Sequence, residues 1–358
     1  MRYSMIAVLV LASGSCSGED QPSAQEVDPN DSSSTPLLTG PVQRLIGGSR
    51  LLGDADDFGL LLGFEVINDE YLLVGDAAAD FHMVVVDIAA GEVVARFGAT
   101  GEGPAEFLGP HRFHPDFART DTWWAYDFAA WTWTPVTMVG GDASVWEIGD
   151  RYSLQGAPVT PESPMWIGEN EALVHGMFSG QSVIRATFEP TTHRVSEWSP
   201  IEVAQPFKDL PEPGLTLLNR SFIATRPSGG FAIAYQYDNW IEIRDPAGEL
   251  VKKIDGPREI TPDYYFTDGR FFWGEDDQNG YVGAHGIESG FYLLWCGEAE
   301  CRRTMAIHQF DWDGNFIQEF AIPSVTDFAI SSNGDRMWGF THEIVPPRIT
   351  EWNLPDPN

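Results

Sequence analysis

A strand–turn–strand pattern recurs along this chain and constrains its fold more than any other feature. In the clearest copy, residues 221–254, four short apolar stretches are separated by turns rich in Gly, Pro, Asp and Asn. This arrangement predicts four antiparallel strands in one meander. The last hairpin of the unit recurs at 84–97, 136–148, 186–198 and 307–320.

The turns of the five hairpins align with one another. They fall at Gly91, Gly141, His193, Gly248 and Gly314, which are 50, 52, 55 and 66 residues apart. This spacing is close to the about 40–50 residues of a four-stranded propeller blade. Three further predicted strands, at 325–330, 336–340 and 348–352, form a sixth blade that lacks its fourth strand.

The missing strand is available near the other end of the chain. Residues 42–47 resemble the end of a fourth strand such as 95–98, and residues 53–58 resemble the segment 101–107 that follows it. We therefore predict that Val42–Gly47 completes the C-terminal blade, which leaves no long unpaired sheet edge. The sequence thus predicts an all-β fold, a six-bladed β-propeller of four-stranded antiparallel blades, over residues 39–358.

The composition of the strands agrees with this architecture. Runs such as 60–62, 83–86 and 291–295 place large apolar side chains on both faces of a strand, which is typical of sheets packed between two neighbours. The aromatic cluster of Trp123, Trp124, Trp131 and Trp133 is expected to pack between blades, and a sugar-binding platform is the alternative.

One segment carries a family resemblance. Phe97-Gly98 followed by Gly101-Glu102-Gly103-Pro104-Ala105-Glu106-Phe107 resembles the G-x-G-P-G-E-F signature of bacterial six-bladed β-propeller lipoproteins related to NHL-repeat proteins. Ala105 replaces the usual Gly of that signature. The resemblance implies the fold and a partner-binding role. From the residues alone, Phe107 should pack between blades and Glu106 should accept backbone N–H bonds.

The N-terminus predicts export. Residues 1–15 contain one basic residue, an apolar run at 5–12 and small residues at 13–15, as in a signal peptide. Cys16 follows directly and resembles the acylated cysteine of bacterial lipoproteins, although Ser13 replaces the usual Leu. Ordinary secretion and an uncleaved cytoplasmic N-terminus are the alternatives.

The segment after Cys16 predicts where the domain is held. Residues 16–38 are rich in Ser, Pro, Asp and Glu and are predicted to form a disordered tether. Ser17 implies, by the lipoprotein resemblance, attachment to the outer membrane, facing the periplasm or the cell surface.

The charge of the chain restricts its partners. The 358 residues include 21 Lys and Arg but 53 Asp and Glu, a formal net charge of −32. Such a surface repels nucleic acid phosphates, so we expect no nucleic acid partner. No apolar run reaches the about 18 residues of a membrane-spanning helix, so membrane contact is expected only through the lipid anchor. We expect a monomer.

Few residues predict chemistry. Cys296 and Cys301 flank a four-residue loop between two predicted strands and are expected to form a disulfide. His111, His114 and Asp116 could hold a metal ion, but loop histidines bonded to backbone are the preferred interpretation.

A second set of residues could face the central channel. The candidates are Asp76, Asp127, His175, Asp238 and His342. A ring of such carboxylates could bind Ca²⁺, whereas capping of the following turns is the preferred interpretation. We therefore expect no cofactor.

Two classes of function follow. The preferred hypothesis is a non-catalytic propeller that binds a protein, peptide or glycan. The alternative is a propeller enzyme, a metal-dependent lactonase-like hydrolase or a lyase, with its site in the central channel. The enzyme requires perturbed carboxylates and histidines that converge there, whereas the binding module requires exposed aromatic and Arg side chains on one rim.

Overall fold

The computed structural model describes residues 41–45, 50–52, 58–78, 80–157, 160–161, 164–168, 170–177, 183–203, 207, 209–211, 218–275, 277–298, 301, 304–340 and 348–355. The chain divides into two compact units, Met1–Leu37 and Leu38–Asn358, and all described residues belong to the second. Cys16 lies outside them. Within the described part of the chain, no helix is long and apolar enough to cross a bilayer.

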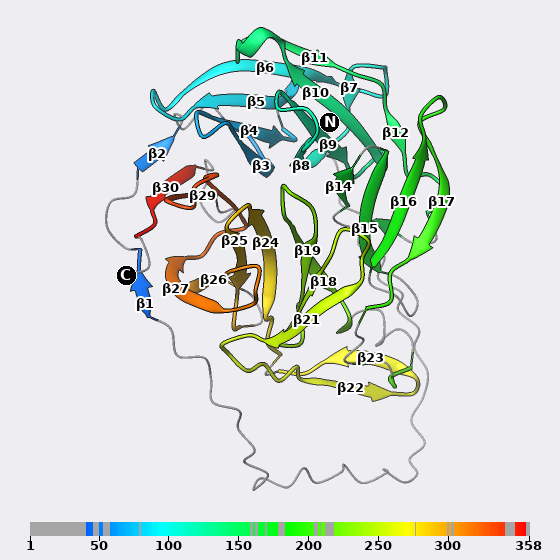
Figure 1. Cartoon of the computed structure of the whole chain (residues 1–358), viewed down its shortest axis with the longest axis vertical. Coiled ribbons are helices and arrows are strands. Elements are labelled where there is room, and N and C mark those ends of the chain that lie inside the picture. The colour runs from blue at the N-terminus through cyan, green and yellow to red at the C-terminus, as the bar shows by residue number, and fades with distance from the viewer. Residues whose placement is uncertain are drawn as a thin grey trace, which may run out of the picture. The chain divides into compact units, whose positions relative to one another are not determined.

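The second unit is a six-bladed β-propeller, and Figure 1 shows its sheets arranged around a common centre. Blade 1 consists, from the centre outward, of β3 (Leu61–Ile67), β4 (Tyr71–Asp76), β5 (Phe81–Asp87) and β6 (Glu92–Thr100). Blade 2 consists of β8 (Pro110–Pro115), β9 (Thr122–Asp127), β10 (Thr132–Met138) and the short β11 (Trp146–Ile148) and β12 (Tyr152–Ser153). Blade 3 consists of β14 (Met165–Gly168), β15 (Glu171–Met177), β16 (Val183–Glu189) and β17 (Arg194–Pro200).

The second half of the ring repeats this plan. Blade 4 consists of β18 (Ser221–Thr225), β19 (Phe231–Tyr235), β20 (Trp240–Arg244) and β21 (Leu250–Asp255). Blade 5 consists of β24 (Tyr281–Ile287), β25 (Gly290–Trp295), β26 (Thr304–Phe310) and β27 (Phe316–Pro323). Blade 6 consists of β28 (Asp327–Ile330), β29 (Arg336–Phe340), β30 (Ile349–Asn353) and β2 (Arg50–Leu52).

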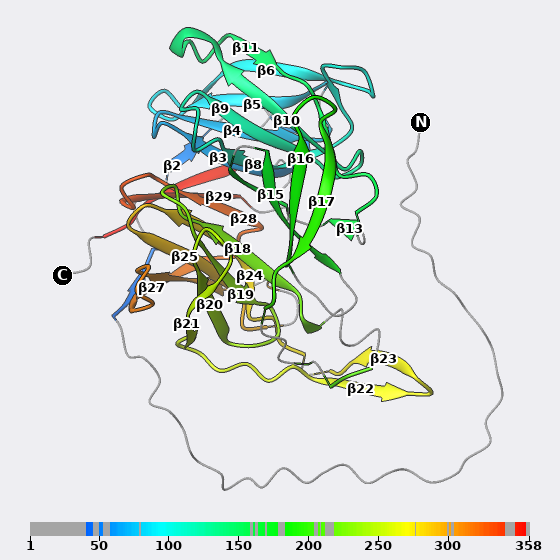
Figure 2. The ribbon, with the colours of Figure 1, turned by 45° about the vertical axis from the view of Figure 1, so that its right-hand side comes forward.

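Six short elements of the described chain lie outside this plan. They are β1 (Val42–Arg44), β7 (Glu106–Phe107), β13 (Thr160–Pro161), the β22–β23 hairpin (Tyr264–Thr267 and Arg270–Trp273) and the 3₁₀ turn η1 (Val139–Gly141). The hairpin forms a separate two-stranded sheet between blades 4 and 5. In Figure 2 it extends away from the blades.

An N-terminal strand closes the ring, as predicted, but the predicted residues were wrong. The strand that completes blade 6 is β2, which pairs antiparallel with β30 through Arg50↔Glu351 and Leu52↔Ile349. Val42–Arg44 instead forms β1, which adds a parallel fifth strand to blade 5 beside β27. A strand of three residues carries too little sequence pattern to identify its partner strand. The partner is decided by the packing of one apolar residue, which is Leu45 directly after β1 and Leu52 at the end of β2.

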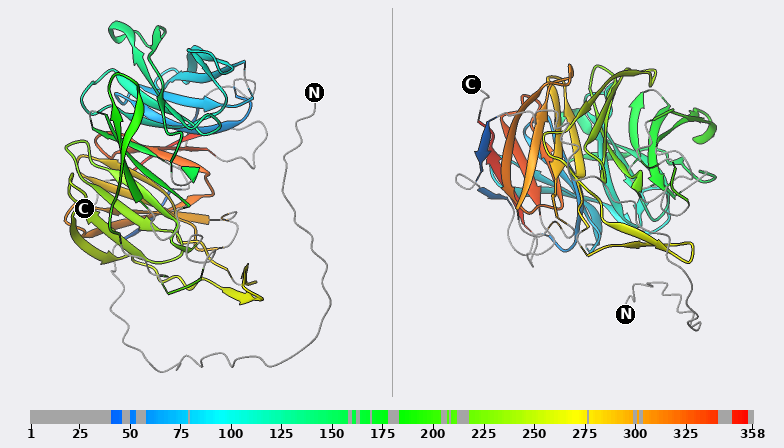
Figure 3. Two further views of the ribbon diagram at one scale, coloured as in Figure 1. Left: turned by 90° about the vertical axis from the view of Figure 1, so that its right-hand side faces the viewer. Right: turned by 90° about the horizontal axis from the view of Figure 1, so that it is seen from below.

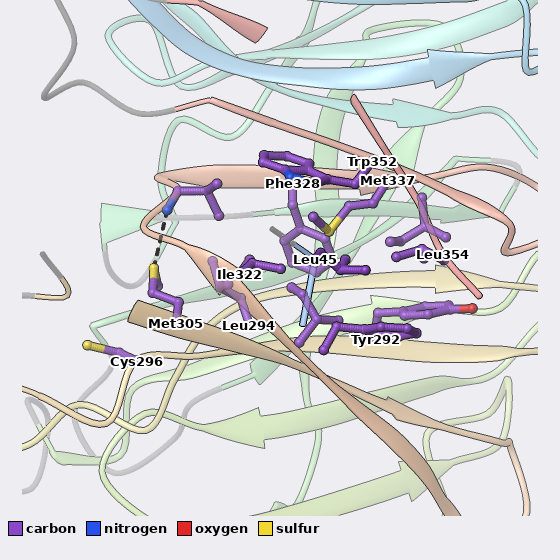
Figure 4. Close-up of a cluster of buried hydrophobic side chains, with 14 of the residues drawn as sticks. Leu45, Tyr292, Leu294, Cys296, Met305, Ile322, Phe328, Met337, Trp352 and Leu354 are labelled. Atoms are coloured by element: carbon purple, nitrogen blue, oxygen red, sulfur yellow. Dashed lines mark hydrogen bonds between the residues drawn. The ribbon is translucent and has the colours of Figure 1, made fainter. Parts of the chain in front are cut away.

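That packing is visible in the apolar clusters between blades. Six clusters occur, and each joins two neighbouring blades. Leu45 belongs to the cluster between blades 5 and 6, where it lies among Tyr292, Phe328 and Trp352 (Figure 4). Leu52 belongs to the cluster between blades 6 and 1. A cluster at every junction is what a closed ring requires.

The aligned turns share one backbone conformation. All five aligned residues have positive φ: Gly91 (75°), Gly141 (76°), His193 (54°), Gly248 (91°) and Gly314 (77°). Residues other than glycine rarely adopt this left-handed region of the backbone. The repeat predicted from sequence spacing is therefore a repeat of local geometry.

The segment with the family resemblance also packs between two blades. Glu106 accepts a hydrogen bond from the Gly103 N–H at 2.7 Å, and Phe107 is fully buried in the cluster between blades 1 and 2, as predicted. At Gly98 (φ 74°) a Cβ atom would approach Phe107 to 3.0 Å and the Met83 Cε to 2.6 Å. Only glycine fits there.

Two other predicted features lie in the described strands. Trp123, Trp124 and Trp133 are buried, and Trp124 stacks on Trp166 of blade 3 with ring centroids 3.6 Å apart. These rings therefore pack between blades. Cys296 and Cys301 form a disulfide across the β25–β26 loop.

Leu52→Ala tests the closing strand. Leu52 is fully buried between blades 6 and 1, so this substitution should lower the free energy of unfolding by about 2–4 kcal/mol. Leu60→Ala, at a side chain that is 46% exposed, is the matched control and should change it by less than about 0.5 kcal/mol. Urea denaturation measures both, and equal effects would contradict closure through β2.

Candidate functional site: the central cavity

The innermost strands of the six blades surround one cavity of about 540 Å³. Each of β3, β8, β14, β18, β24 and β28 contributes lining residues. Figure 1 shows the blades arranged around these strands, and both panels of Figure 3 show the blades from the edge of the ring, side by side. A cavity of this size holds a ligand of about drug size.

The cavity walls are largely apolar. Aromatic and aliphatic side chains from different blades line it: Phe64, Phe113, Phe117, Trp123, Met165, Phe222, Ile223, Phe328 and Ile330. Between these walls lie a few polar side chains, and their protonation states decide what the cavity can bind.

Glu65 is the first of these polar groups. It lies on β3 with 8% of its surface exposed, and its carboxyl accepts a hydrogen bond from the Val66 N–H at 2.8 Å. The pKa of Glu65 is raised from 4.5 to about 8, mainly by burial and also by the nearby Asp327 carboxylate, against the opposing effects of the Val66 N–H and of Arg112. The Glu65 carboxyl is therefore protonated at neutral pH and can donate a hydrogen bond.

Arg112 and Asp327 form an ion pair beside Glu65. The Arg112 Nη1 atom lies 3.0 Å from the Asp327 Oδ1 atom, which joins β8 of blade 2 to β28 of blade 6. Burial raises the pKa of Asp327, and the Arg112 guanidinium opposes that rise. The ion pair brings a positive and a negative charge into the cavity together.

His114 connects two blades across the cavity. Its Nδ1 atom lies 3.0 Å from the Pro115 carbonyl oxygen, which can only accept, so Nδ1 carries the proton. Its Nε2 atom therefore accepts from the Thr225 hydroxyl of β18, at 2.7 Å. Burial lowers the pKa of His114 to about 4, so the imidazole is neutral at pH 7.

His285 has the same protonation state. It lies on β24, and burial lowers its pKa to about 4 while a hydrogen bond with the Ile330 backbone opposes the shift. The two histidines lie close enough that a positive charge on His285 would lower the pKa of His114 further. Both rings are therefore uncharged at neutral pH.

The remaining charged groups of the lining also have partners. The Asp116 carboxylate lies 2.6 Å from the Arg119 guanidinium, and the Glu288 carboxylate lies 3.0 Å from that of Arg226. The Asp69 carboxylate accepts hydrogen bonds from the Ser332 N–H and hydroxyl. Three of the four ionised carboxylates of the lining thus pair with an arginine, and the fourth, Asp69, bonds to an uncharged serine.

The channel candidates from the sequence occupy other places. The Asp76 carboxylate accepts backbone N–H bonds from Gly59 and Leu60 at 2.7 and 2.8 Å. Asp127 binds the Leu108 and Ala129 N–H groups at 2.7 and 3.1 Å.

Asp238 behaves similarly. It accepts from the Trp240 N–H at 3.0 Å, and burial raises its pKa. Asp76 and Asp127 end the second strand of their blades, and Asp238 lies just after it. None of the three is in the cavity lining, because the first strand of each blade is innermost. The side chain of His175 and the whole of His342 lie outside the described residues.

Sequence reasoning missed most of the cavity. It did not single out Glu65, Arg112, His285 or Asp327, and it considered His114 only beside His111 and Asp116. A usable signal was present, because these groups lie on the first predicted strand of their blades. Among the described residues, no group of three or more His, Cys, Asp and Glu side chains could hold a metal ion.

Comparisons with known proteins support the fold. No family model and no curated protein matches the chain. Many solved structures are similar in fold, among them the following three. A streptogramin B lyase is 11% identical with a TM-score of 0.52, and the match covers 86% of this chain and 98% of the lyase. A DUF4221 family member from Bacteroides vulgatus is 8% identical, with a TM-score of 0.56 and coverages of 85% and 95%.

The third structure is a protein from Bacteroides fragilis described as a candidate exported protein. It is 13% identical with a TM-score of 0.52, and the match covers 89% of this chain and all of that protein. At these identities the likeness shows the β-propeller fold alone.

Glu65→Gln tests the protonation state of the cavity. The unfolded carboxyl loses its proton near pH 4.5, whereas the folded one keeps it until about pH 8, so the wild type loses stability as pH rises between these values. Gln does not ionise. The free energy of unfolding of the variant, relative to the wild type, should therefore rise from pH 5 to 8, by at most about 1.4 kcal/mol per pH unit.

Urea denaturation at several pH values measures this difference, and contributions from His114 and His285 cancel because both chains contain them. Glu70→Gln, at an exposed position in the next turn, is the control and should give a flat difference. A flat difference for Glu65→Gln as well would show that Glu65 is ionised in the folded protein.

Proposed function

We propose that the protein is an exported propeller that binds an uncharged organic ligand in its central cavity. The observation that supports this proposal most is that, in a strongly acidic protein, the charged groups deepest in this largely apolar cavity are paired, as Arg112 with Asp327, or neutral, as Glu65, His114 and His285. An anion or cation would have to displace the Arg112–Asp327 pair, which is costly when one partner is left buried. A neutral molecule needs only hydrogen bonds.

The polar groups define the complementary ligand. Glu65 can donate a hydrogen bond, and neutral His285, which bonds to the Ile330 backbone through one ring nitrogen, can accept one through the other. Both ring nitrogens of His114 already bond to Pro115 and Thr225. Aromatic walls favour a ligand with flat or apolar faces. Of the partner classes expected from the sequence, a glycan end or a short uncharged peptide fits this volume, whereas a folded protein could contact only the rim. A free small molecule, which the sequence did not predict, fits as well.

The cellular location of this activity is part of the proposal. The predicted signal peptide and Cys16 favour export and acylation, and the likeness in fold to a candidate exported protein agrees with export. The Gly98–Phe107 geometry is compatible with the lipoprotein resemblance. Outer-membrane attachment through Cys16 therefore remains our proposal for the mature protein.

Acid–base catalysis is the second candidate, and a specific observation favours it. A protonated carboxyl with a pKa of about 8 and a neutral imidazole with an oriented Nε2 atom are the groups that a lyase or hydrolase needs. A streptogramin B lyase shares the fold. Conversion of the bound molecule by the wild type, but not by Glu65→Gln, would identify an enzyme.

Ala284→Phe tests cavity binding. Ala284 lines the cavity on β24, so a phenyl ring there should occupy the ligand's place. We expect a small molecule to co-purify with the wild type from its native envelope and to fall by about tenfold or more in the variant. Extraction and mass spectrometry of the purified protein measure it.

Ala284→Ser is the matched control, because it changes the polarity at the same site without filling the cavity. It should retain the co-purified molecule. An equal amount of that molecule in the wild type and in Ala284→Phe would place binding elsewhere and contradict the proposal.

A further inference from the structure

Three polar side chains from neighbouring blades meet on one wall of the cavity. Arg112 lies on β8 of blade 2 and Asp327 on β28 of blade 6, and their ion pair joins these two strands. Blade 1 lies between blades 6 and 2, and its innermost strand, β3, carries Glu65. The charges of Arg112 and Asp327 both act on the Glu65 carboxyl, so the three groups lie close together.

Two atoms of this group are available to a ligand. The Arg112 Nη1 atom bonds to Asp327, but within the described part of the chain nothing accepts from its Nη2 atom, and the side chain is 32% exposed. One oxygen of the Glu65 carboxyl accepts from the Val66 N–H. None of the described residues bonds to the other oxygen.

Both available atoms are hydrogen-bond donors. A guanidinium nitrogen can only donate, and the protonated Glu65 carboxyl presents an O–H group at neutral pH. The Asp327 carboxylate next to them already accepts from the Phe64 and Phe328 N–H groups as well as from Arg112. This wall is therefore complementary to an acceptor oxygen, and the bond from the charged guanidinium is the stronger of the two.

Acceptors are scarce in the inner part of the cavity. Both ring nitrogens of His114 are already bonded, to Pro115 and Thr225. His285 donates to the Ile330 backbone and keeps one nitrogen that can accept. A glycan end brings several hydroxyl donors, and each buried donor without an acceptor weakens binding. A carbonyl oxygen accepts two hydrogen bonds and brings no donor.

We propose that the cavity binds a neutral carbonyl compound of the amide or ester class, whose carbonyl oxygen accepts from the Glu65 hydroxyl and from the Arg112 Nη2 atom. This inference rests on the proposed function, because it names the ligand class for the same cavity. When the ligand is an amide, its N–H group has an acceptor in His285. A short uncharged peptide therefore suits the cavity better than a glycan end.

Four probes of similar size test the recognition of a carbonyl. N-methylbenzamide and methyl benzoate contain one, benzyl methyl ether lacks it, and methyl β-D-glucoside represents a glycan end. Titrations of the purified full chain, followed by ligand-observed NMR, give the Kd of each probe. We expect the wild type to bind the amide and the ester at least about tenfold more tightly than the ether, because the ether forms neither strong hydrogen bond.

Variants of the two donors test which atoms bind the carbonyl. Glu65→Met removes one donor and leaves the Arg112–Asp327 pair intact, so it should weaken binding of N-methylbenzamide by about fivefold to tenfold. Binding of the ether should change by less than about twofold, because it needs only an intact cavity. Arg112→Lys keeps a positive charge beside Asp327 but loses the planar second donor, and it should act in the same way. Glu70→Met, at an exposed position in the next turn, is the matched control and should keep all wild-type affinities.

Four outcomes would overturn the inference. They are equal wild-type affinities for N-methylbenzamide and the ether, an unchanged ratio of these affinities in both donor variants, tighter binding of the glucoside than of the amide, and no binding of any probe.

Ala284→Phe separates this inference from the proposed function. Loss of all probes in that variant, when the wild type does not discriminate between amide and ether, would leave the cavity as the binding site without carbonyl recognition. Unchanged binding of all probes in Ala284→Phe would place binding outside the cavity, so that the proposed function itself fails.

Discussion

The pairing of β2 with β30 holds the propeller together, because it joins residues from near the two ends of the chain in one sheet. β2 contributes only three residues, but Leu52 is buried beside Trp338 and Ile349 of blade 6 and completes the junction with blade 1. The other five junctions each join blades that follow one another along the chain. Closure at the sixth makes the ring rigid, and a rigid ring can hold six inner strands around a cavity of fixed shape.

The cavity carries a property that the overall composition hides. The chain has a net charge of −32, yet inside the ring burial keeps Glu65 protonated and His114 neutral, and Arg112 balances Asp327. All of these states follow from desolvation, which disfavours any unpaired charge. The strongly acidic composition of the chain therefore does not describe the inner part of the cavity, which is where we propose that an uncharged molecule binds.

The sequence predicts the repeat well and the site poorly, for different physical reasons. Turns with positive φ favour glycine, so Gly91 and Gly248 mark the spacing of the blades directly in the sequence. The structural roles of Glu106 and Phe107 could be predicted from the neighbouring residues of their motif. A strand of only three residues has too little sequence pattern to predict which strand it pairs with. For this reason the sequence predicts the wrong blade for the strand that begins at Val42. The cavity depends on side chains more than 200 residues apart, such as Arg112 and Asp327, and no local pattern connects them.

The most direct test of the ring is a disulfide between its two ends. Arg50 and Glu351 lie opposite each other on β2 and β30, so a Cys16→Ser chain that also carries Arg50→Cys and Glu351→Cys should form this cross-link when folded. Arg44 lies on β1 beside blade 5, and Arg44→Cys with Glu351→Cys should not form it. Mass spectrometry of the oxidised protein distinguishes the two pairs. A cross-link at residues 50 and 351 supports a ring closed by β2, and its absence, or equal cross-linking from position 44, contradicts it.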